Sequence, residues 1–552
     1  MLDLIVKGGS VVDGTGRNRF TADVGIRNGR IAAVGKVGES ARTVIDAKDR
    51  VVAPGFIDPH THFDVQLLWD GQARPALEHG ITTIVPGNCS LSLAPIRKAD
   101  RRSVVGMFQQ IEEMPEAAFT DAFEWNFESF AGYRDAIARH LAINVAPLVG
   151  HSVIRLWVMG PAAQQRAATR DELVAMQNLL RECLDAGAVG LSTSFVDVDE
   201  NLRPVPSRFA YTAELDALAQ VLGERKRVLQ VVPEFYATDL TIARIDQLAE
   251  LSLRYDITTT FSPLFDSRAT PDNVPRTMAR VEEQFARGAR VWPQVQTRPI
   301  DISFSFDQPS LFFARFPTWY RVMRLPRAER LTALRDAATA DKLVAETGPD
   351  GGRALLGRLL VRGGEGAPES LVGRTLAEIA DERGANCARA LIDVSLENDL
   401  RVPFLAANMG HEDNDRVGRL LAHPHVHVGA SDGGAHIKSF STYGDTGYLL
   451  GHFVRETHHL TLEAAVKKIT ADTADIWGLE GRGRLVPGAA ADVVVFDPAR
   501  IDRGVEHAAF DMPGGGMRYI REAIGVDWVL VNGDVAWCDG RYTQARAGRV
   551  CT

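Results

Sequence analysis

The 552-residue sequence predicts an α/β protein, a TIM-like (β/α)8 barrel that carries a small β-sandwich domain formed from both termini. Short apolar runs recur along the middle of the chain with helical patterns between them, which is typical of βα units in a parallel sheet. Eight such runs are present, and eight strands close a barrel. Both ends of the chain instead alternate apolar and polar residues, which indicates strands with one exposed face.

Residues 1–54 and 484–552 are predicted to be the two parts of the β-sandwich. Asn28-Gly29 lies between two apolar runs and is a strong hairpin signal. Val526 to Val531 has a similar strand-like residue pattern near the other end of the chain. Hairpins from one end alone would lack a core, so we expect the two ends to share one.

Residues 55–483 are predicted to form the barrel. Helices are expected from Arg170 to Asp185 and from Thr212 to Leu222. The eight expected strands are Gly55 to Phe63, Ile81 to Pro86, Ile143 to Val149, Ala188 to Thr193, Val228 to Val232, Thr258 to Phe261, Arg290 to Val295 and Val426 to Ala430.

Two connections are much longer than the others, at about 90–142 and 300–425, and the second begins with the aromatic stretch 304–319. Long insertions in compact α/β domains are typical of lids and binding loops. Exposed aromatic residues also occur at subunit contacts, so a homo-oligomer is the alternative.

The composition is that of a globular protein, with 45% hydrophobic and 24% charged residues. A net charge of −9 gives no electrostatic support for nucleic acid or an anionic membrane as a partner. The first residues lack the features of a signal peptide, and no apolar run is long enough for a membrane span, which predicts a cytoplasmic protein. The five cysteines are scattered and show no CxxC spacing, so neither a disulfide framework nor a structural zinc knuckle is expected.

His60 and His62 end the first expected strand. Side chains alternate along an extended segment, so these two imidazoles project to the same side and can grip one metal ion. Cys89 ends the second expected strand, where its thiolate can ligate zinc; a buried, inert cysteine is the alternative. Asp432 ends the eighth, where it can bind metal and take a proton from water; an Asx-turn or a helix cap is the alternative.

These residues lie in motifs that resemble the amidohydrolase superfamily, and within it the D-aminoacylase (N-acyl-D-amino-acid deacylase) group. The motifs are Gly-Phe-Ile-Asp-x-His-x-His at 55–62, Gly-Asn-Cys-Ser at 87–90 and Ser-Asp-Gly at 431–433, with further matches at 149–152, 186–192 and 487–492. The resemblance spans nearly the whole chain. It implies that His60, His62 and Asp432 are metal ligands, that Asp432 is the general base, and that Cys89 holds a tightly bound zinc with two further histidines.

Those two histidines, expected on the fifth and sixth strands, are missing. The chain reads Leu229-Gln230-Val231 and Thr260-Phe261-Ser262 where the group has Thr-His-x-Arg and Ser-His-His-Lys, and the lysine that helps to fix a substrate carboxylate is absent too. No lysine stands where a carboxylated lysine would restore a two-metal site. We therefore predict one divalent ion per chain, zinc, held by His60, His62 and Asp432 with Cys89 beside it, and Glu234 as a candidate extra ligand.

Two more residues are candidates for substrate binding. Arg298 follows the seventh strand, and its planar fork suits a carboxylate; His151 ends the third. The alternatives are a surface arginine, a structural histidine and, for Glu234, a salt bridge at a strand end. The other histidines considered are expected on the surface or on helix faces: His411, His423, His425, His427, His458 and His459.

The resulting prediction is a metal-dependent hydrolase that cleaves the amide C–N bond of a small molecule, by deacylation of an N-acyl-(D-)amino acid whose stereochemistry the sequence leaves open. Asp432 would take a proton from the attacking water and deliver it to the leaving nitrogen. The missing lysine leaves open an amidohydrolase that acts on a cyclic amide, a dipeptide-like amide or another carboxamide. The missing histidines leave open a catalytically silent relative that acts as a binding protein.

Overall fold

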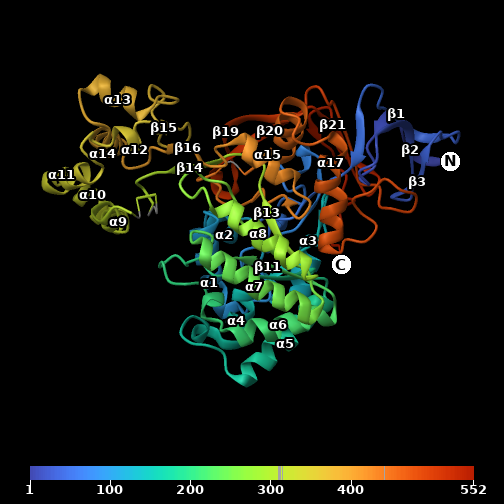
Figure 1. Ribbon diagram of the computed structural model, residues 1–552, viewed down its shortest axis with the longest axis horizontal. Helices are drawn as coiled ribbons and strands as arrows, with labels where there is room; N and C mark the ends of the chain where they lie inside the picture. Colours follow the sequence, from blue (N-terminus) through green and yellow to red (C-terminus); the bar gives the residue numbers. More distant parts are fainter. Residues whose placement is uncertain (309–311, 314, 441, 552) are drawn as a thin grey trace.

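Parallel strands from the middle of the chain form a closed barrel in the computed structural model, which describes residues 1–308, 312–313, 315–440 and 442–551 (Figure 1). All eight expected strands are present. They are β6 Phe56–Asp58, β7 Ile81–Ile84, β8 Asn144–Val145 with β9 Leu148–Gly150, β10 Gly190–Ser194, β11 Val228–Val232, β12 Thr259–Phe261, β13 Val291–Val295 and β17 His427–Val428.

The third expected strand is divided between two neighbours, because β8 pairs with β7 and β9 pairs with β10. The barrel closes between the residues that follow its first and last strands. Asp432 N donates to His60 O at 3.1 Å, and His62 N donates to Gly433 O at 2.7 Å. The predicted fold class is confirmed, and the closing hydrogen bonds bring the first and last strands' motifs together.

Helices cover the outside of the barrel, among them α4 His151–Met159, α5 Arg170–Asp185, α6 Thr212–Glu224, α7 Thr238–Tyr255, α8 Asn273–Ala286 and α15 Asn414–Ala422. The expected helices at 170–185 and 212–222 correspond to α5 and α6. A capping box of Thr169 and Glu172 satisfies backbone N–H groups at the start of α5, which explains why the helix begins there. In the first insertion, α1 Arg101–Ile111 packs Met107 and Phe108 into the barrel core.

Strands from both chain ends share one nine-stranded sheet. Its N-terminal strands lie at the right of Figure 1. The N-terminal strands are β1 Leu2–Val11, β2 Phe20–Arg27, β3 Arg30–Gly35, β4 Ala41–Asp46 and β5 Val51–Pro54; the C-terminal strands are β18 Val493–Phe496, β21 Val526–Val531, β22 Asp534–Cys538 and β23 Arg541–Tyr542. β5 pairs antiparallel with β18 and so joins the two ends. The expected hairpin turn is present: Asn28 and Gly29 have φ of 52° and 73°.

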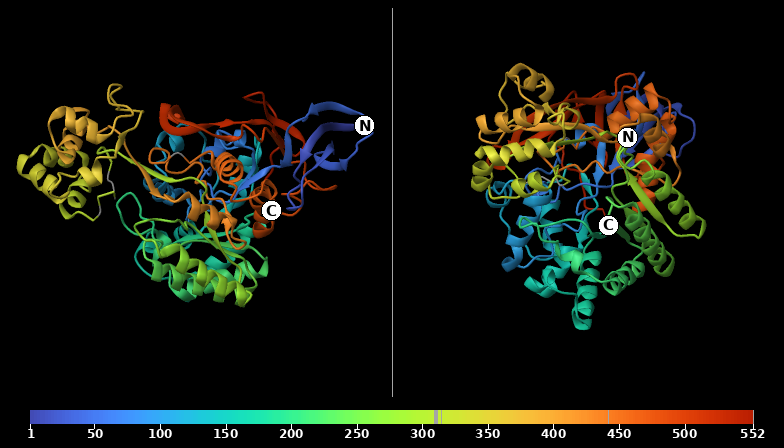
Figure 2. Two further views of the ribbon diagram at one scale, coloured as in Figure 1. Left: turned by 45° about the horizontal axis from the view of Figure 1, so that its top comes forward. Right: turned by 60° about the vertical axis from the view of Figure 1, so that its left-hand side comes forward.

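Residues 300–410 form a lobe with its own hydrophobic core, which projects from the barrel (Figure 2). Phe306, Phe313 and Trp319 are fully buried there, whereas residues 309–311 and 314 of the aromatic stretch lie outside the described residues. The elements are β14 Ile300–Phe304, α9 Pro317–Met323, α10 Arg327–Arg335, α11 Ala337–Glu346, α12 Arg353–Leu356, β15 Leu360–Val361, α13 Leu376–Arg383, α14 Cys387–Glu397 and β16 Phe404–Gly410.

A two-stranded hairpin of β19 Asp502–Met512 and β20 Gly516–Ile524 leaves the terminal sheet and runs along the barrel toward the lobe (Figures 1 and 2). β19 contacts α16 Asp445–Tyr448, which follows the last barrel strand. The C-terminal segment therefore reaches the carboxyl ends of the barrel strands. No helix among the described residues combines the length and apolarity needed to cross a membrane.

Candidate metal centre and active site

His60 and His62 lie just past β6, at the carboxyl edge of the barrel, and each is 1% exposed. Their ring centroids are 5.4 Å apart, as expected for two imidazoles that project to one side. Gly434 lets the last strand's loop pass close to them, because a Cβ there would lie 2.9 Å from the carbonyl of His62. The two histidines are thus held against the loop that carries Asp432.

Cys89 and Asp432 meet the histidines from the second and eighth strands. Cys89 Sγ lies 3.3 Å from His60 Nε2. Asp432 Oδ1 lies 3.2 Å from the same nitrogen and 3.9 Å from His62 Nε2. The donor atoms of His60, His62 and Cys89 all lie within 4.8 Å of one another.

This donor set fits a divalent metal ion. Ligands bound to zinc at about 2.0–2.3 Å in a tetrahedron are themselves roughly 3.3–3.8 Å apart, close to the separations observed here. Nitrogen, sulfur and carboxylate oxygen are the zinc ligands found in proteins. His62 Nε2 is buried without a hydrogen-bond partner, an arrangement that costs free energy unless another ligand binds it.

The outward nitrogens of both histidines contact other buried side chains. His60 Nδ1 is 2.7 Å from Gln294 Oε1 on β13, so with the amide oxygen as acceptor Nδ1 carries the proton and Nε2 keeps its lone pair for a metal. His62 Nδ1 is 2.9 Å from Oε1 of Glu112, which follows α1 in the first insertion. Such outer contacts orient metal-binding imidazoles in known sites.

Acidic groups around the site respond differently to burial. Burial raises the pKa of Asp64 to about 7 and that of Glu112 to about 8. Burial also raises the pKa of Asp432, but His60, His436, His62 and Arg298 lower it by more, so its pKa lies below the ordinary value. Asp432 therefore carries a negative charge, and a cation beside it would also offset the cost of burying the other carboxyl groups.

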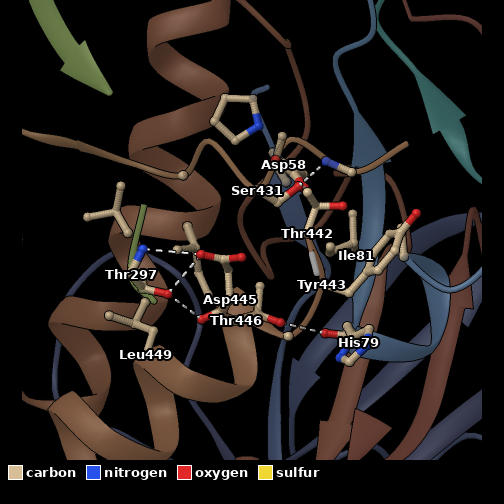
Figure 3. Close-up of a pocket in the computed structure, with 18 residues that line it drawn as sticks. Asp58, His79, Ile81, Thr297, Ser431, Thr442, Tyr443, Asp445, Thr446 and Leu449 are labelled. Atoms are coloured by element: carbon tan, nitrogen blue, oxygen red, sulfur yellow. Dashed lines mark hydrogen bonds between the residues drawn. The ribbon is translucent and has the colours of Figure 1, made fainter. Parts of the chain in front are cut away.

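The loop before Asp432 is fixed by a buried network. Ser431 Oγ donates to Asp58 Oδ2, and Asp445 Oδ1 accepts from the backbone N–H and the hydroxyl of Thr297 (Figure 3). Asp432 itself has a left-handed φ of 56°, and such strain persists only where the surroundings enforce it. The network holds Asp432 at the donor cluster while its side chain stays 24% exposed.

Two predicted site residues, Glu234 and His151, are engaged elsewhere. Both carboxylate oxygens of Glu234 contact Arg244, at 2.8 and 3.4 Å, so Glu234 does not join the donor cluster. His151 contacts Thr193 Oγ1 and Glu214 Oε1 through its two nitrogens and is 1% exposed. Both residues thus occupy the structural roles that were their alternatives.

Arg298 is buried and lines a pocket that also contains Asp432. Its Nη1 donates to Asp445 Oδ2 at 2.8 Å, and its Nη2 donates to the carbonyl of Ser431 at 3.1 Å. The guanidinium therefore stabilises the loop that carries Asp432. It lines the pocket beside Asp432, but Asp445 and the Ser431 carbonyl accept its hydrogen bonds.

The expected surface position of two histidines is wrong. His411 and His427 are each 1% exposed, because one lies at the end of β16 against the barrel and the other on the barrel strand β17. His423 and His425 are partly exposed and share Glu282 Oε1, at 3.3 and 2.7 Å. The backbone N–H of His425 donates to His423 Nδ1, which leaves the proton of a neutral ring on Nε2, where it can be donated to Glu282.

Sequence reasoning missed Glu112 and Gln294, and it considered Gln230 only as a substitute ligand for the missing histidines. Gln230 Oε1 accepts from the Cys89 backbone N–H at 3.2 Å, so it supports the turn that presents the thiol. A signal existed for both glutamines, since each is a lone amide in an apolar barrel strand, Val-Leu-Gln-Val-Val and Val-Trp-Pro-Gln-Val. No local pattern distinguishes Glu112 from the other acidic residues of its insertion.

Known proteins resemble this chain along most of its length. The profile described as "Amidohydrolase family" matches residues 43–228 and 331–536. The chain is 32% identical to a D-aminoacylase of Alcaligenes xylosoxydans xylosoxydans over 99% of this chain and 97% of that protein. A solved D-aminoacylase with a binuclear metal centre, described by one-metal activation and second-metal attenuation, has a TM-score of 0.70 and 30% identity with full coverage of both chains. An N-acyl-D-glutamate deacylase from Bordetella bronchiseptica, solved with zinc and a phosphonate inhibitor, has a TM-score of 0.70 and 29% identity over 100% of this chain and 99% of that one.

Proposed function

The chain belongs to the amidohydrolase family, and from this premise we propose that it is a metal-dependent hydrolase that removes the acyl group from N-acyl-D-amino acids. The single observation that carries the proposal is the convergence of His60, His62, Cys89 and Asp432 at the carboxyl edge of the barrel. The named activities of the relatives supply the substrate class.

We further propose zinc as the ion, with one ion per chain. The mixed nitrogen, sulfur and oxygen donors support zinc. One ion is supported by the fifth and sixth strands, where Gln230 and Thr260 lie side by side at positions that carry no imidazole. A divalent ion at this site supplies Lewis acidity, which makes water a better nucleophile at neutral pH and polarises an amide carbonyl.

Asp432 performs the proton transfers. Its side chain is partly exposed and lines the adjoining pocket, so it can contact both water and substrate. Asp432 accepts the proton of the attacking water as the new C–O bond forms, and then delivers it to the amide nitrogen as the C–N bond breaks. The products are a free carboxylic acid and the amine of the amino acid.

The experiment that tests the proposal combines metal analysis with substrate assays. Purified protein should contain about one divalent ion per chain. It should hydrolyse N-acetyl-D-amino acids and leave the L-enantiomers and cyclic amides largely intact. Absence of turnover of every N-acetyl-D-amino acid, with zinc, manganese or cobalt supplied, would refute the proposed function.

A further inference from the structure

A pocket opens beside Asp432, between the barrel and the β19–β20 hairpin. Its volume is about 360 Å³ including the part open to solvent. Besides Asp432, its charged lining residues are Arg298 and Asp301 after β13, and Arg503, Glu506 and Arg521 on the hairpin. A substrate whose carbonyl carbon lies at Asp432 would therefore share the pocket with three arginine side chains.

Most of these charges are already paired inside the protein. Arg298 is held by Asp445 and by the Ser431 carbonyl. Glu506 accepts from Arg362 Nε at 2.6 Å. Asp301 Oδ1 accepts from the backbone of Asn408. Arg503 and Arg521 remain as cations of the pocket lining that still have N–H donors available to a ligand.

Arg503 is the more available of the two. Its guanidinium lies over the ring of Tyr448, 4.3 Å from the centroid, and no carboxylate of the described residues lies within ion-pair distance of it. A cation stacked on an aromatic face is held in place while its five N–H donors stay free in its plane. Tyr448 therefore orients Arg503 without neutralising it.

Arg521 is a second cation of the same pocket, and only some of its N–H donors have partners in the protein. Its Nη1 donates to the carbonyl of Gly504 at 2.9 Å, and its Nη2 is 3.4 Å from Glu506 Oε2. Its Nε is buried with no partner. Because Arg503 and Arg521 lie on the paired strands β19 and β20, the hairpin fixes their spacing.

We propose that Arg503, with Arg521 beside it, binds the carboxylate of the substrate while the scissile amide lies at Asp432. The inference rests on the proposed function and names the residues that select its substrates. A guanidinium matches a carboxylate with two parallel N–H donors, so the ligand class is an amide that bears a carboxylate near its nitrogen. The C-terminal hairpin is then the specificity element of this active site.

The test compares each carboxylate substrate with its neutral counterpart. The probes are N-acetyl-D-leucine, N-acetyl-D-methionine and N-acetyl-D-glutamate, each assayed beside the compound in which the α-carboxylate is a primary carboxamide. In R503M the flexible apolar side chain keeps contact with Tyr448 but loses the donors. R503M should raise KM for the carboxylates about 10- to 100-fold with little change in kcat, and should leave kcat/KM for the carboxamides within about twofold. R503K should lie between R503M and the wild type, because lysine keeps the charge without the fork.

R500M is the matched control, since Arg500 is exposed, lies three residues before Arg503 and lines no part of this pocket. It should behave as wild type. Equal losses on carboxylates and carboxamides in R503M, or no loss on either, would overturn the assignment of Arg503. Wild-type protein that hydrolyses carboxamides as well as carboxylates would overturn this assignment alone, whereas turnover of neither set would refute the proposed function and this inference together.

Discussion

Glu112 Oε1 lies 2.9 Å from His62 Nδ1. Both side chains are buried, although Glu112 belongs to the first insertion and His62 follows a barrel strand. The contact fixes the ring from the side opposite Asp432. We predict that E112Q weakens metal binding about 10- to 100-fold, because a bound cation favours the charged form of Glu112, and a neutral amide holds the imidazole less firmly than that carboxylate does. The measurement is the zinc dissociation constant, obtained by competition with a chromogenic chelator.

The control for this prediction is E116Q. Glu116 lies in the same insertion but is exposed, with an ion pair to Arg102 of the kind that contributes little to stability. E116Q should bind zinc as tightly as the wild type. If E112Q matches the wild type in zinc affinity while the thermal midpoint of the metal-free protein drops, Glu112 is a packing residue and has no role at the metal.

Asp432 should be indispensable for turnover. D432N keeps the shape of the side chain and its backbone hydrogen bond to His60 but removes the group that accepts a proton. We expect kcat to fall by at least about 10²-fold while far-UV circular dichroism stays unchanged. A variant that keeps more than about a tenth of the wild-type rate would show that another residue is the base.

The barrel and the terminal sheet could be predicted because their signals are local. Each barrel strand is a short apolar run, and Asn28-Gly29 fixes a turn that needs two positive φ angles. The independent core of the 300–410 lobe could not be predicted, since its helices have the same apolar pattern as helices that cover the barrel. What separates them is long-range packing around Trp319 and Phe404.

The site divides in the same way. His60, His62, Cys89 and Asp432 stand at strand ends and can be found by their order along the chain. Glu112 and Arg503 reach the site from an insertion and from the C-terminal hairpin, and their places depend on tertiary packing alone. Glu234 has the right residue type at a strand end, but Arg244 from the next helix forms an ion pair with it.

Cys89 should set the metal preference of the site. Burial raises the pKa of its thiol well above the ordinary value, and Asp197, Glu112 and Asp432 add to that rise, so the thiol is protonated in metal-free protein. In C89S we expect weaker zinc binding and, with cobalt as a probe, loss of the thiolate-to-cobalt absorption band. C183S is the control because Cys183 is buried in α5 among apolar residues. A cobalt spectrum unchanged by C89S would exclude the thiol from the metal.

A buried charge network should tie stability to pH through Glu214. Arg155 Nη1 contacts both carboxylate oxygens of Glu214 at 2.5 Å, and both side chains are fully buried. Burial alone raises the pKa of Glu214, but His151 and Arg155 lower it by more, so this pKa lies below its ordinary value of 4.5. A carboxyl group with a lowered folded pKa stabilises the fold at pH values above its unfolded pKa and loses that contribution as the pH falls through the folded value.

E214Q leaves Arg155 without its counter-charge and should reduce the free energy of unfolding by about 3–5 kcal/mol at neutral pH. The difference in thermal midpoint between wild type and E214Q should stay constant down to about pH 5 and narrow below 4.5. E172Q, which alters a partly exposed helix-capping residue, should show a much smaller loss at neutral pH. A gap for E214Q that widens in acid would contradict the assignment.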